Sequence, residues 1–373
     1  MKVLFLYLKA FSFTGGIEKF NRSFLKALHE LSVDGFMDAD AISAYDSFPD
    51  EKYFPRLRFR GFDSWRLLFV FDAFFKSFKY QTVIIGHINL AVVGYWIKRV
   101  NPSVRLVIIA HGIEVWKTQY GNKRRALEKA DIILAVSNFT KQKIVEFNLT
   151  VNADKIKIFP NAIDPHFKVP VNFAKPAYLL HRYGLSATTP VLLTVTRLAF
   201  SEKYKGYDGV IESMPDLLNI DKNLVYLICG KADNVEKERI ELLIEKTRGA
   251  HSVKLLGFIP DSELIDHYLL ADVFIMQSKK EGFGIVFIEA LACGRMVIAG
   301  SKDGSSEALL QGELGKLIDP DNKEELRRAI DESLNAEGYD PSRLQKRVIG
   351  AFGFDKYKDR LKDYLINENQ DAA

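Results

Sequence analysis

The sequence predicts neither a disulfide framework nor an export signal. Only two of its 373 residues are cysteines, Cys229 and Cys293, and both lie in apolar runs far apart in the sequence. They are expected to be buried thiols of a reducing compartment. The first residues, MKVLFLYLKAFSF, have no small-residue cleavage site and predict a buried strand. We therefore expect a cytoplasmic protein.

Long apolar runs and known metal or cofactor motifs are also missing. The most apolar stretch, WRLLFVFDAFFKSFKYQTVIIG, is interrupted by Asp72, Lys76 and Lys79, so it is not expected to span a bilayer. There is no zinc-ligand spacing, no phosphate loop and no G-x-S-x-G sequence. The DAD sequence at 38–40 is open to interpretation as a metal-binding Asp-x-Asp, but it follows no strong apolar run and predicts a solvated loop. The sequence thus predicts no metal and no cofactor.

Positive charge is concentrated in the first half of the chain. Residues 1–170 carry 25 Lys and Arg against 16 Asp and Glu, whereas the remaining residues carry 27 against 32. A basic half suits an anionic surface or an anionic substrate. Ordinary surface charge is the alternative, and we expect no nucleic acid partner.

Short apolar runs alternate with amphipathic segments along the whole chain, which is typical of parallel sheets covered by helices on both faces. The pattern occurs twice and predicts two Rossmann-like, doubly wound domains, 1–170 and 171–350, that face each other across a cleft. The boundary between the two domains is expected in the proline-containing segment 164–178. The amphipathic helix within 351–373 is expected to pack back on the N-terminal domain. The runs that predict strands are VLFLYL, TVIIGH, RLVIIAH, DIILAVS and KIKIFP, then PVLLTVT, NLVYLICG, VKLLGF, DVFIMQS and RMVIAGS.

Two glutamates flank a glycine-rich, apolar stretch that follows one of these runs. The sequence EGFGIVFIEALACG predicts a turn and then a helix after the strand DVFIMQS. Gly282 and Gly284 would let the backbone approach a ligand, and the first amides of the helix attract anions. Glu281 precedes the helix, and Glu289 lies on the order of 8 Å further along its axis. This order matches the separate hydroxyl groups of a nucleotide sugar, although a capped helix with two surface glutamates is the alternative.

Two cations follow the first strand of the second half. Arg197 comes directly after PVLLTVT, and Lys205 precedes Gly206 and the next helix. A guanidinium and an ammonium at one strand end can neutralise a diphosphate. A solvated basic loop is the alternative.

The first half has its own candidates at strand ends. Gly15 and Gly16 form a predicted strand-to-helix turn that lacks the G-x-G-x-x-G fingerprint of dinucleotide binding. His87 and His111 each end an apolar run, where a histidine can bind a sugar hydroxyl or stabilise developing charge. We favour a functional role for His111, with purely structural histidines as the alternative.

Taken together, these residues resemble glycosyltransferase family 4, the retaining enzymes of the GT-B fold. The Glu281–Glu289 pair resembles the two-glutamate element of that family, and TRL…KG resembles its diphosphate clamp. Further matches cover nearly the whole chain in the family's usual order: the Gly-Gly turn, AHG at 110–112, AVSNFT at 135–140 and IFPNAID at 158–164. The chain departs from the family at Ala162, where Gly is usual, and at Gly112, where Asp is usual.

The resemblance implies roles for individual residues. Glu289 would bind the ribose, and Glu281 would contact the donor sugar near the amides of Phe283 and Gly284. His111 would face the sugar close to the reacting carbon. The implied catalytic residues are Glu281, His111, Arg197 and Lys205, the last two gripping the diphosphate. The implied substrate-binding residues also include Gly15, Gly16, His87, Gly257, Gly282, Phe283, Gly284, Ile285 and Glu289.

The resemblance also implies a reaction. It is the metal-independent transfer of a hexose from a nucleotide-diphosphate sugar to a glycan, lipid-linked or small hydroxyl acceptor, in polysaccharide or glycoconjugate biosynthesis. A GT-B epimerase or phosphorylase-like enzyme, and a non-catalytic nucleotide-sugar-binding subunit, remain as alternatives. The segment 63–80 mixes aromatic and basic residues, and Lys123-Arg124-Arg125 adds charge. It predicts peripheral contact with anionic lipid on the inner face of the cell membrane, with a core helix as the alternative.

Overall fold

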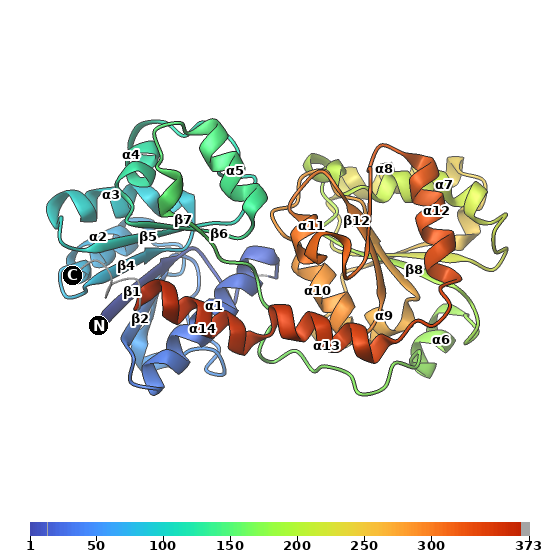
Figure 1. Ribbon diagram of the computed structural model, residues 1–373, viewed down its shortest axis with the longest axis horizontal. Coiled ribbons are helices and arrows are strands. Elements are labelled where there is room, and N and C mark those ends of the chain that lie inside the picture. Colours follow the sequence, from blue (N-terminus) through green and yellow to red (C-terminus); the bar gives the residue numbers. More distant parts are fainter. Residues whose placement is uncertain (13, 367–373) are drawn as a thin grey trace. The chain divides into compact units, whose positions relative to one another are not determined.

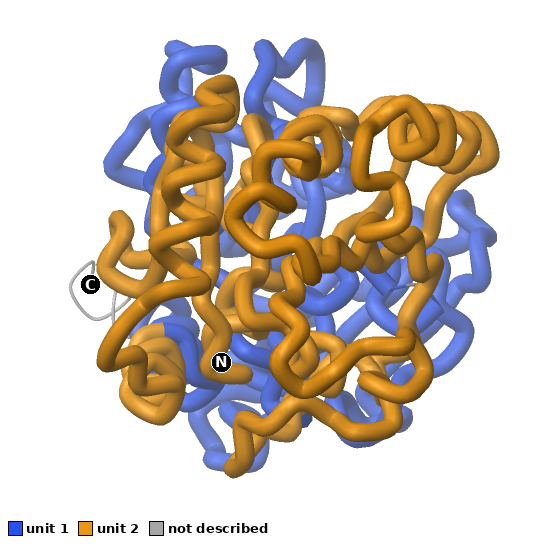
Figure 2. Tube along the Cα trace, turned by 90° about the vertical axis from the view of Figure 1, so that its right-hand side faces the viewer, with its two compact units in different colours: residues 1–166, 352–373 blue, residues 167–351 orange. Residues whose placement is uncertain are grey.

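The computed structural model describes residues 1–12 and 14–366 and contains two compact units (Figures 1 and 2). One unit comprises Met1–His166 and the segment that begins at Phe352, and the other comprises Phe167–Ala351. Each unit is built around its own parallel sheet covered by helices, so the predicted pair of Rossmann-like domains is confirmed. The chain passes from unit 1 to unit 2 within the segment 164–178, where we expected the boundary between the domains.

Unit 1 contains a seven-stranded sheet in the order β3-β2-β1-β4-β5-β6-β7. The strands are β1 (Lys2–Tyr7), β2 (Asp38–Ser43), β3 (Phe59–Gly61), β4 (Thr82–Ile85), β5 (Arg105–Ala110), β6 (Ile132–Ala135) and β7 (Ile156–Ile158). The main helices are α1 (Gly16–Val33), α2 (Arg66–Ser77), α3 (Ala91–Val100), α4 (Gly121–Lys129), α5 (Asn138–Phe147) and α14 (Phe354–Leu365), with short turns η1 (Arg56–Arg58), η2 (Ile88–Leu90) and η3 (Ala153–Lys155). The strand order reverses between β1 and β4.

Unit 2 contains a six-stranded sheet in the order β10-β9-β8-β11-β12-β13. The strands are β8 (Val191–Val195), β9 (Val225–Cys229), β10 (Val253–Gly257), β11 (Val273–Met276), β12 (Met296–Gly300) and β13 (Lys316–Ile318). The helices are α6 (Ala177–Tyr183), α7 (Tyr207–Leu217), α8 (Asn234–Lys246), α9 (Asp261–Leu270), α10 (Ile285–Ala292), α11 (Ser305–Ala308), α12 (Lys323–Leu334) and α13 (Pro341–Phe352), with η4 (Phe200–Lys205), η5 (Ala250–Ser252) and η6 (Leu310–Gly312). Here the order reverses between β8 and β11.

The apolar runs form the buried centres of both sheets. Every residue of β4, β6 and β11 is buried, because helices cover both faces of the strands. All the strand pairs are parallel, as consecutive strand–helix–strand units require. Cys229 and Cys293 are both buried free thiols.

The loop predicted at residues 38–40 is wrong, because these residues begin β2. Ala39 and Ala41 are buried, and Asp38 and Asp40, which alternate with them along the strand, are only partly exposed. Asp38 pairs with Arg58 at 2.7 Å, and Asp40 accepts a hydrogen bond from the Tyr80 hydroxyl at 2.5 Å. These partners allow an acidic sequence to form a strand near the edge of the sheet.

The C-terminal helix α14 packs against α1 in unit 1 (Figure 1). Lys358 forms an ion pair with Glu30 of α1 at 3.0 Å. The guanidinium of Arg105 donates to the carbonyls of Tyr364 and Leu365 at the end of the helix. The chain therefore returns to unit 1 after completing unit 2.

No helix within residues 1–12 and 14–366 combines the length and apolar character that crossing a membrane requires. The segment 63–80 contains α2, which is buried on one face only, at Phe69, Ala73 and Ser77. One side of α2 therefore belongs to the core, and the alternative of a core helix holds for that side alone.

Candidate active site

The predicted diphosphate clamp lies where the strand order of unit 2 reverses. β8 and β11 are neighbours in the sheet, and the loops that follow them lead to α7 and α10. Ligands of open parallel sheets bind at this position, beyond the carboxyl ends of the strands. The loop after β8 carries Arg197 and Lys205, and the loop after β11 carries Glu281.

Direct contacts join these two loops. The ammonium of Lys205 lies 2.5 Å from a carboxylate oxygen of Glu281. The Gln277 amide donates to the carbonyl of Gly206 at 3.1 Å, and the Lys279 N–H donates to the carbonyl of Tyr204 at 2.9 Å. The structure therefore brings together two candidate residues that are 76 positions apart in the sequence.

Burial and a neighbouring negative charge have opposite effects on the pKa of Lys205. Removal from water lowers the pKa of its ammonium, but the adjacent Glu281 carboxylate outweighs this effect and holds the pKa above its usual value. Lys205 is therefore a partly buried cation at neutral pH. A fixed positive charge of this kind can stabilise an anion that replaces or shares its carboxylate partner.

Asp303 positions Glu281, although the sequence analysis missed it. The backbone N–H of Glu281 donates to the Asp303 carboxylate at 2.6 Å, and the N–H of Ser305 donates to it at 2.9 Å. Burial raises the pKa of Asp303 to about 6. Asp303 follows the apolar run RMVIAGS, so the strand-end rule used for the other candidates would have found it.

Arg197 has an internal partner that the sequence did not reveal. Its Nε donates to Glu202 at 3.2 Å, and its Nη2 donates to the other oxygen of the same carboxylate. The Arg197 side chain is 65% exposed, whereas that of Glu202 is 12% exposed. A planar guanidinium that binds one carboxylate in this two-pronged manner can bind a phosphate in the same geometry.

The turn between β11 and α10 depends on a glycine. Gly284 has φ +86°, and a Cβ there would lie 2.4 Å from the ring of Phe287. It is the N-cap of α10, of which Ile285 is the first residue, and Phe283 beside it is buried. Gly257 ends β10, two strands away from β8, with open space where a Cβ would lie.

Glu289 lies in the middle of α10 and is buried. Its carboxylate accepts a hydrogen bond from the Tyr268 hydroxyl of α9 at 2.8 Å. The alternative of two surface glutamates is therefore wrong for Glu289. Its role as a ribose ligand stays a prediction.

The loop after β1 in unit 1 is held by Asp46. The carboxylate accepts from the backbone N–H groups of Ala10, Phe11 and Ser12 at 2.8–3.0 Å. The loop leads to Gly15, the N-cap of α1, which has an extended backbone. A Cβ at Gly15 would lie 2.5 Å from the Glu18 carboxylate, whereas Gly16 has open space at this position.

His87 and His111 lie together at the ends of β4 and β5. Their rings stack with centroids 6.2 Å apart, and His111 makes an edge contact with Phe20 of α1. Burial lowers the pKa of both rings, and burial together with the neighbouring His111 lowers the pKa of His87 to about 4. Both imidazoles are therefore neutral at pH 7.

The hydrogen bonds of His111 fix its tautomer. Nε2 lies 2.8 Å from the carbonyl of Gly86, which can only accept, so the neutral ring carries its proton on Nε2. The backbone N–H groups of His111 and Gly112 both donate to Glu114, a positioning residue that the sequence analysis missed. Nδ1 is then the ring atom that can accept a hydrogen bond from a ligand.

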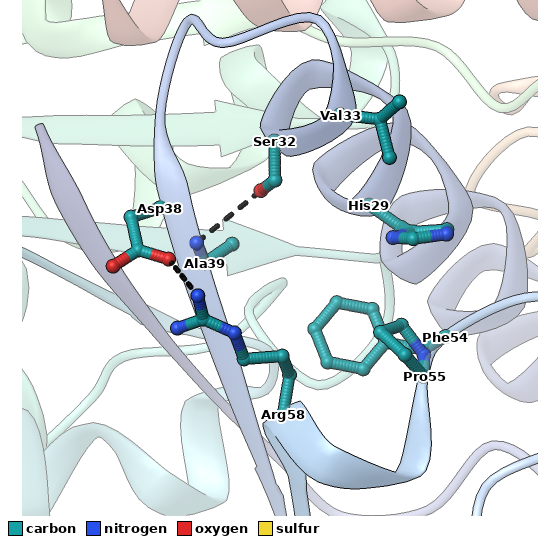
Figure 3. A pocket seen from close by; sticks show the side chains of 8 residues that line it. All are labelled: His29, Ser32, Val33, Asp38, Ala39, Phe54, Pro55 and Arg58. Atoms are coloured by element: carbon teal, nitrogen blue, oxygen red, sulfur yellow. Dashed lines mark hydrogen bonds and ion pairs between the residues drawn. The ribbon is translucent and has the colours of Figure 1, made fainter.

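A separate surface pocket lies between α1 and β2 of unit 1 (Figure 3). The Arg58–Asp38 ion pair and the hydrogen bond from the Ala39 N–H to the Ser32 hydroxyl connect its walls. The pocket contains none of the predicted site residues. It is lined by His29, Ser32, Val33, Asp38, Ala39, Phe54, Pro55 and Arg58.

Two family models match the chain, one in each unit. Residues 14–167 match the model described as Glycosyltransferase Family 4, and residues 181–349 match Glycosyl transferases group 1. Together the matches include every predicted site residue.

Named relatives are similar to this chain over about two thirds of its length or more. A GDP-mannose-dependent alpha-(1-6)-phosphatidylinositol monomannoside mannosyltransferase of Mycolicibacterium smegmatis is 29% identical over 257 residues, which are 66% of this chain and 64% of the relative. A D-inositol 3-phosphate glycosyltransferase of Corynebacterium diphtheriae is 26% identical over 287 residues, 72% of this chain and 65% of the relative. The chain thus spans less than two thirds of the length of either relative.

Solved structures share the whole fold. HepE from Anabaena in complex with UDP is similar with a TM-score of 0.78 and 20% identity, covering 98% of this chain and 99% of HepE. Sucrose-phosphate synthase from Thermosynechococcus elongatus has a TM-score of 0.79 and 20% identity over all of both chains. From the family matches and this shared fold, the chain belongs to glycosyltransferase family 4 and has the GT-B fold.

Proposed function

We propose that the protein is a retaining glycosyltransferase that uses a nucleotide-diphosphate sugar as donor. The observation that carries this proposal is the contact between Lys205 and Glu281 at the reversal point of the unit 2 sheet. Arg197 stands on the same loop as Lys205 and can supply a second positive charge. This set matches the charge pattern of a donor, which is anionic at the diphosphate and rich in hydroxyl groups at the sugar.

The proposed chemistry follows from the charges that develop in the reaction. The anomeric C–O bond breaks with its electron pair going to the departing diphosphate, where Arg197 and Lys205 stabilise the negative charge. The acceptor hydroxyl attacks from the same face, and its proton passes to a diphosphate oxygen. The sugar therefore keeps its anomeric configuration, and no protein base is needed.

Glu281 and His111 would orient the donor sugar. Glu281 is held through its backbone by Asp303, so its carboxylate is directed by a buried partner. His111 is neutral at pH 7, and its Nδ1 can accept a hydrogen bond from a sugar hydroxyl. Neutral imidazole also avoids an additional charge close to the reacting carbon.

Names of similar proteins guide the choice of donor and acceptor. HepE has been solved with UDP and with UDP-glucose, and the Mycolicibacterium relative is named for GDP-mannose and a phosphatidylinositol mannoside. We propose a hexose donor with UDP or GDP and a glycan, lipid-linked or small hydroxyl acceptor, in metal-independent polysaccharide or glycoconjugate synthesis. We further propose that the enzyme works in the cytoplasm or at the inner face of the cell membrane.

Calorimetric titration and turnover test this proposal. Wild-type protein is titrated with UDP, GDP and ADP in EDTA, and the nucleotide that binds is then supplied as its hexose donors with sugar and lipid-linked acceptors. We expect one nucleotide to bind, donor turnover without metal, and a product whose NMR coupling shows the donor's anomeric configuration. Lys205→Ala should lower kcat/KM by roughly 100-fold or more, whereas Lys237→Ala on the surface of α8 is a matched control.

Several outcomes would overturn the proposal. Donor binding without transfer to any acceptor would indicate a binding subunit. Conversion of the donor sugar without an acceptor would indicate an epimerase. Absorption by a bound pyridoxal phosphate would indicate a phosphorylase, and an inverted product would exclude the retaining mechanism.

A further inference from the structure

Helix α2 in unit 1 is apolar on the side that faces away from the core. Its buried side consists of Phe69, Ala73 and Ser77, which are spaced four residues apart and face the sheet and α3. A surface helix normally carries polar residues on the opposite side. In α2 the opposite side is occupied by Leu and Phe.

The exposed side chains form one continuous stripe along the helix. Leu67, Phe71, Phe75 and Phe78 follow one another at intervals of four, four and three residues, and they are 79%, 62%, 62% and 49% exposed. The rings of Phe71 and Phe75 stack on each other in the middle of the stripe. The α2 patch, as we define it, consists of Trp65, Leu67, Leu68, Val70, Phe71, Phe75 and Phe78, all of them exposed.

The patch continues onto the neighbouring helix. α2 packs beside α3, which exposes Trp96 and Val100 (Figure 1). Contiguous exposed apolar surface of this kind is uncommon in a soluble protein and marks an interaction site. The remaining question is which partner fits it.

Positive charges outnumber negative charges around the patch, where Asp63 precedes α2 and Asp131 pairs with Lys98 of α3 at 2.8 Å. Helices α2, α3 and α4 contain eight Lys and Arg and two carboxylates, Asp72 and Glu128. Asp72 is paired with Arg60 at 2.5 Å and with Lys76 at 3.4 Å, and Glu128 is paired with Arg124 at 3.3 Å. Neither carboxylate is therefore left to oppose an anionic partner.

From these contacts we propose that the α2 patch docks unit 1 onto an anionic lipid bilayer. The Leu and Phe stripe would enter the boundary between headgroups and acyl chains, with Trp65 at its N-terminal end. The surrounding cations would face the lipid phosphates, each adding attraction that salt weakens. A second copy of the chain fits less well, because a symmetric pair would bring two basic helix layers together.

This inference goes beyond the proposed reaction and does not depend on it. Binding to vesicles needs no donor, no acceptor and no turnover. Failure of the membrane proposal would therefore leave the proposed function untouched, and the reverse is also true.

Co-sedimentation of the full chain with vesicles tests the proposal. We compare phosphatidylcholine vesicles with and without phosphatidylglycerol at low and high salt. Wild-type protein should bind the anionic vesicles and be released by salt, and Leu67→Glu with Phe71→Glu should weaken binding roughly tenfold or more. The control is Leu149→Glu with Leu242→Glu, which replaces two exposed leucines elsewhere and should bind as the wild type does.

Two further measurements keep the test decisive. Thermal unfolding of the double variant should match the wild type, because both side chains are exposed. Brominated lipid should quench the fluorescence of the wild type, and Trp65→Phe should reduce this quenching, with the remainder coming from Trp96 on α3.

The proposal is overturned if the double variant binds anionic vesicles as well as the wild type does. Equal binding to neutral vesicles would also overturn it, as would absence of binding at low salt. A dimer in light scattering that the double variant converts to a monomer, without vesicle binding, would assign the patch to a second copy instead.

Discussion

The Arg197–Glu202 pair predicts how a single side chain would set the affinity of the proposed diphosphate site. A diphosphate that binds Arg197 must compete with the Glu202 carboxylate, which occupies the same guanidinium edge. Glu202→Gln removes this competing charge. We expect roughly two- to fivefold tighter binding of the nucleoside diphosphate, because Arg197 is largely exposed and the pair is screened by water.

Isothermal titration of the variant with UDP and GDP measures this effect. Glu212→Gln is the matched control, since Glu212 pairs with Lys323 on the surface of the same unit. Weaker binding by Glu202→Gln would mean that Glu202 positions Arg197 for the ligand.

Substitution of the buried Glu289 can distinguish a ribose contact from a purely structural role. If Glu289 binds ribose, Glu289→Gln should weaken UDP or GDP about tenfold and leave pyrophosphate binding unchanged, since only the nucleotide has a ribose. Equilibrium titration with both ligands makes the comparison. Tyr268→Phe removes the hydrogen bond from the Tyr268 hydroxyl to this carboxylate and serves as the structural control. Equal loss for both ligands would contradict the ribose role.

The two histidines of unit 1 predict how stability depends on pH. The unfolded chain protonates His87 below its ordinary pKa of 6.5, whereas the folded chain does so only near pH 4. The unfolded state therefore binds more protons in this window, and the free energy of unfolding falls as the pH falls. Asp303 in unit 2, with its raised pKa, contributes with the opposite sign.

Urea unfolding of wild type and His87→Gln at pH 7 and pH 5 isolates the histidine term. We expect the wild type to lose roughly 2 kcal/mol more than the variant over this interval. His251→Gln changes a histidine outside this pair and should behave as the wild type does. Identical pH dependence in His87→Gln and wild type would show that His87 titrates normally.

At the scale of elements, the turn between β11 and α10 is fixed by the backbone of Gly284. Alanine at this position would keep a positive φ that disfavours side chains, and its Cβ would meet the ring of Phe287. We expect Gly284→Ala to destabilise unit 2 by about 1–3 kcal/mol and to weaken nucleotide binding. Gly338 also has a positive φ but has open space where a Cβ would lie, so Gly338→Ala measures the backbone strain without the clash. An unchanged midpoint of chemical denaturation in Gly284→Ala would contradict the expected cost.

Three strands could not be read from the sequence, and all three are short or polar. β3 is the sequence FRG, β13 is KLI, and β2 begins with two aspartates. β3 and β13 are edge strands of three residues each, and β2 has aspartates at its partly exposed positions, so none of the three contains the continuous apolar run that identified strands such as β4 and β11. Only pairing with a neighbour defines them, and that pairing is a tertiary event.

The residues of the candidate active site were likewise predicted only in part from the sequence. Arg197, Lys205 and Glu281 were identified because they follow an apolar run or precede a glycine. Asp303 follows an apolar run and was overlooked, whereas Glu202 was missed because its contact with Arg197 is defined only once the loop has folded. The contact between Lys205 and Glu281 depends on which loops the sheet places together. β8 and β11 are separated by two strands in sequence and are adjacent in the sheet.

At the scale of the whole molecule, each unit has its own core, and a different probe can follow the unfolding of each. All three tryptophans, Trp65, Trp96 and Trp116, lie in unit 1, whereas the proposed diphosphate clamp lies in unit 2. A nucleoside diphosphate at about 100 times its Kd stabilises the unit that binds it by roughly 2.7 kcal/mol. We expect the calorimetric transition of unit 2 to move to higher temperature by more than the transition seen by tryptophan fluorescence. Equal shifts of both transitions would contradict independent unfolding of the units.

The sequence by itself determined the number of domains, their parallel sheets, the family and the polar residues at the strand ends. Each of these depends on local periodicity, on glycine and proline positions, or on short motifs, which a linear chain carries directly. The tertiary structure alone decided that Glu281 faces Lys205, that Glu202 occupies Arg197, and that one side of α2 remains uncovered. These features depend on which segments pack together, and burial is defined only once the chain has folded.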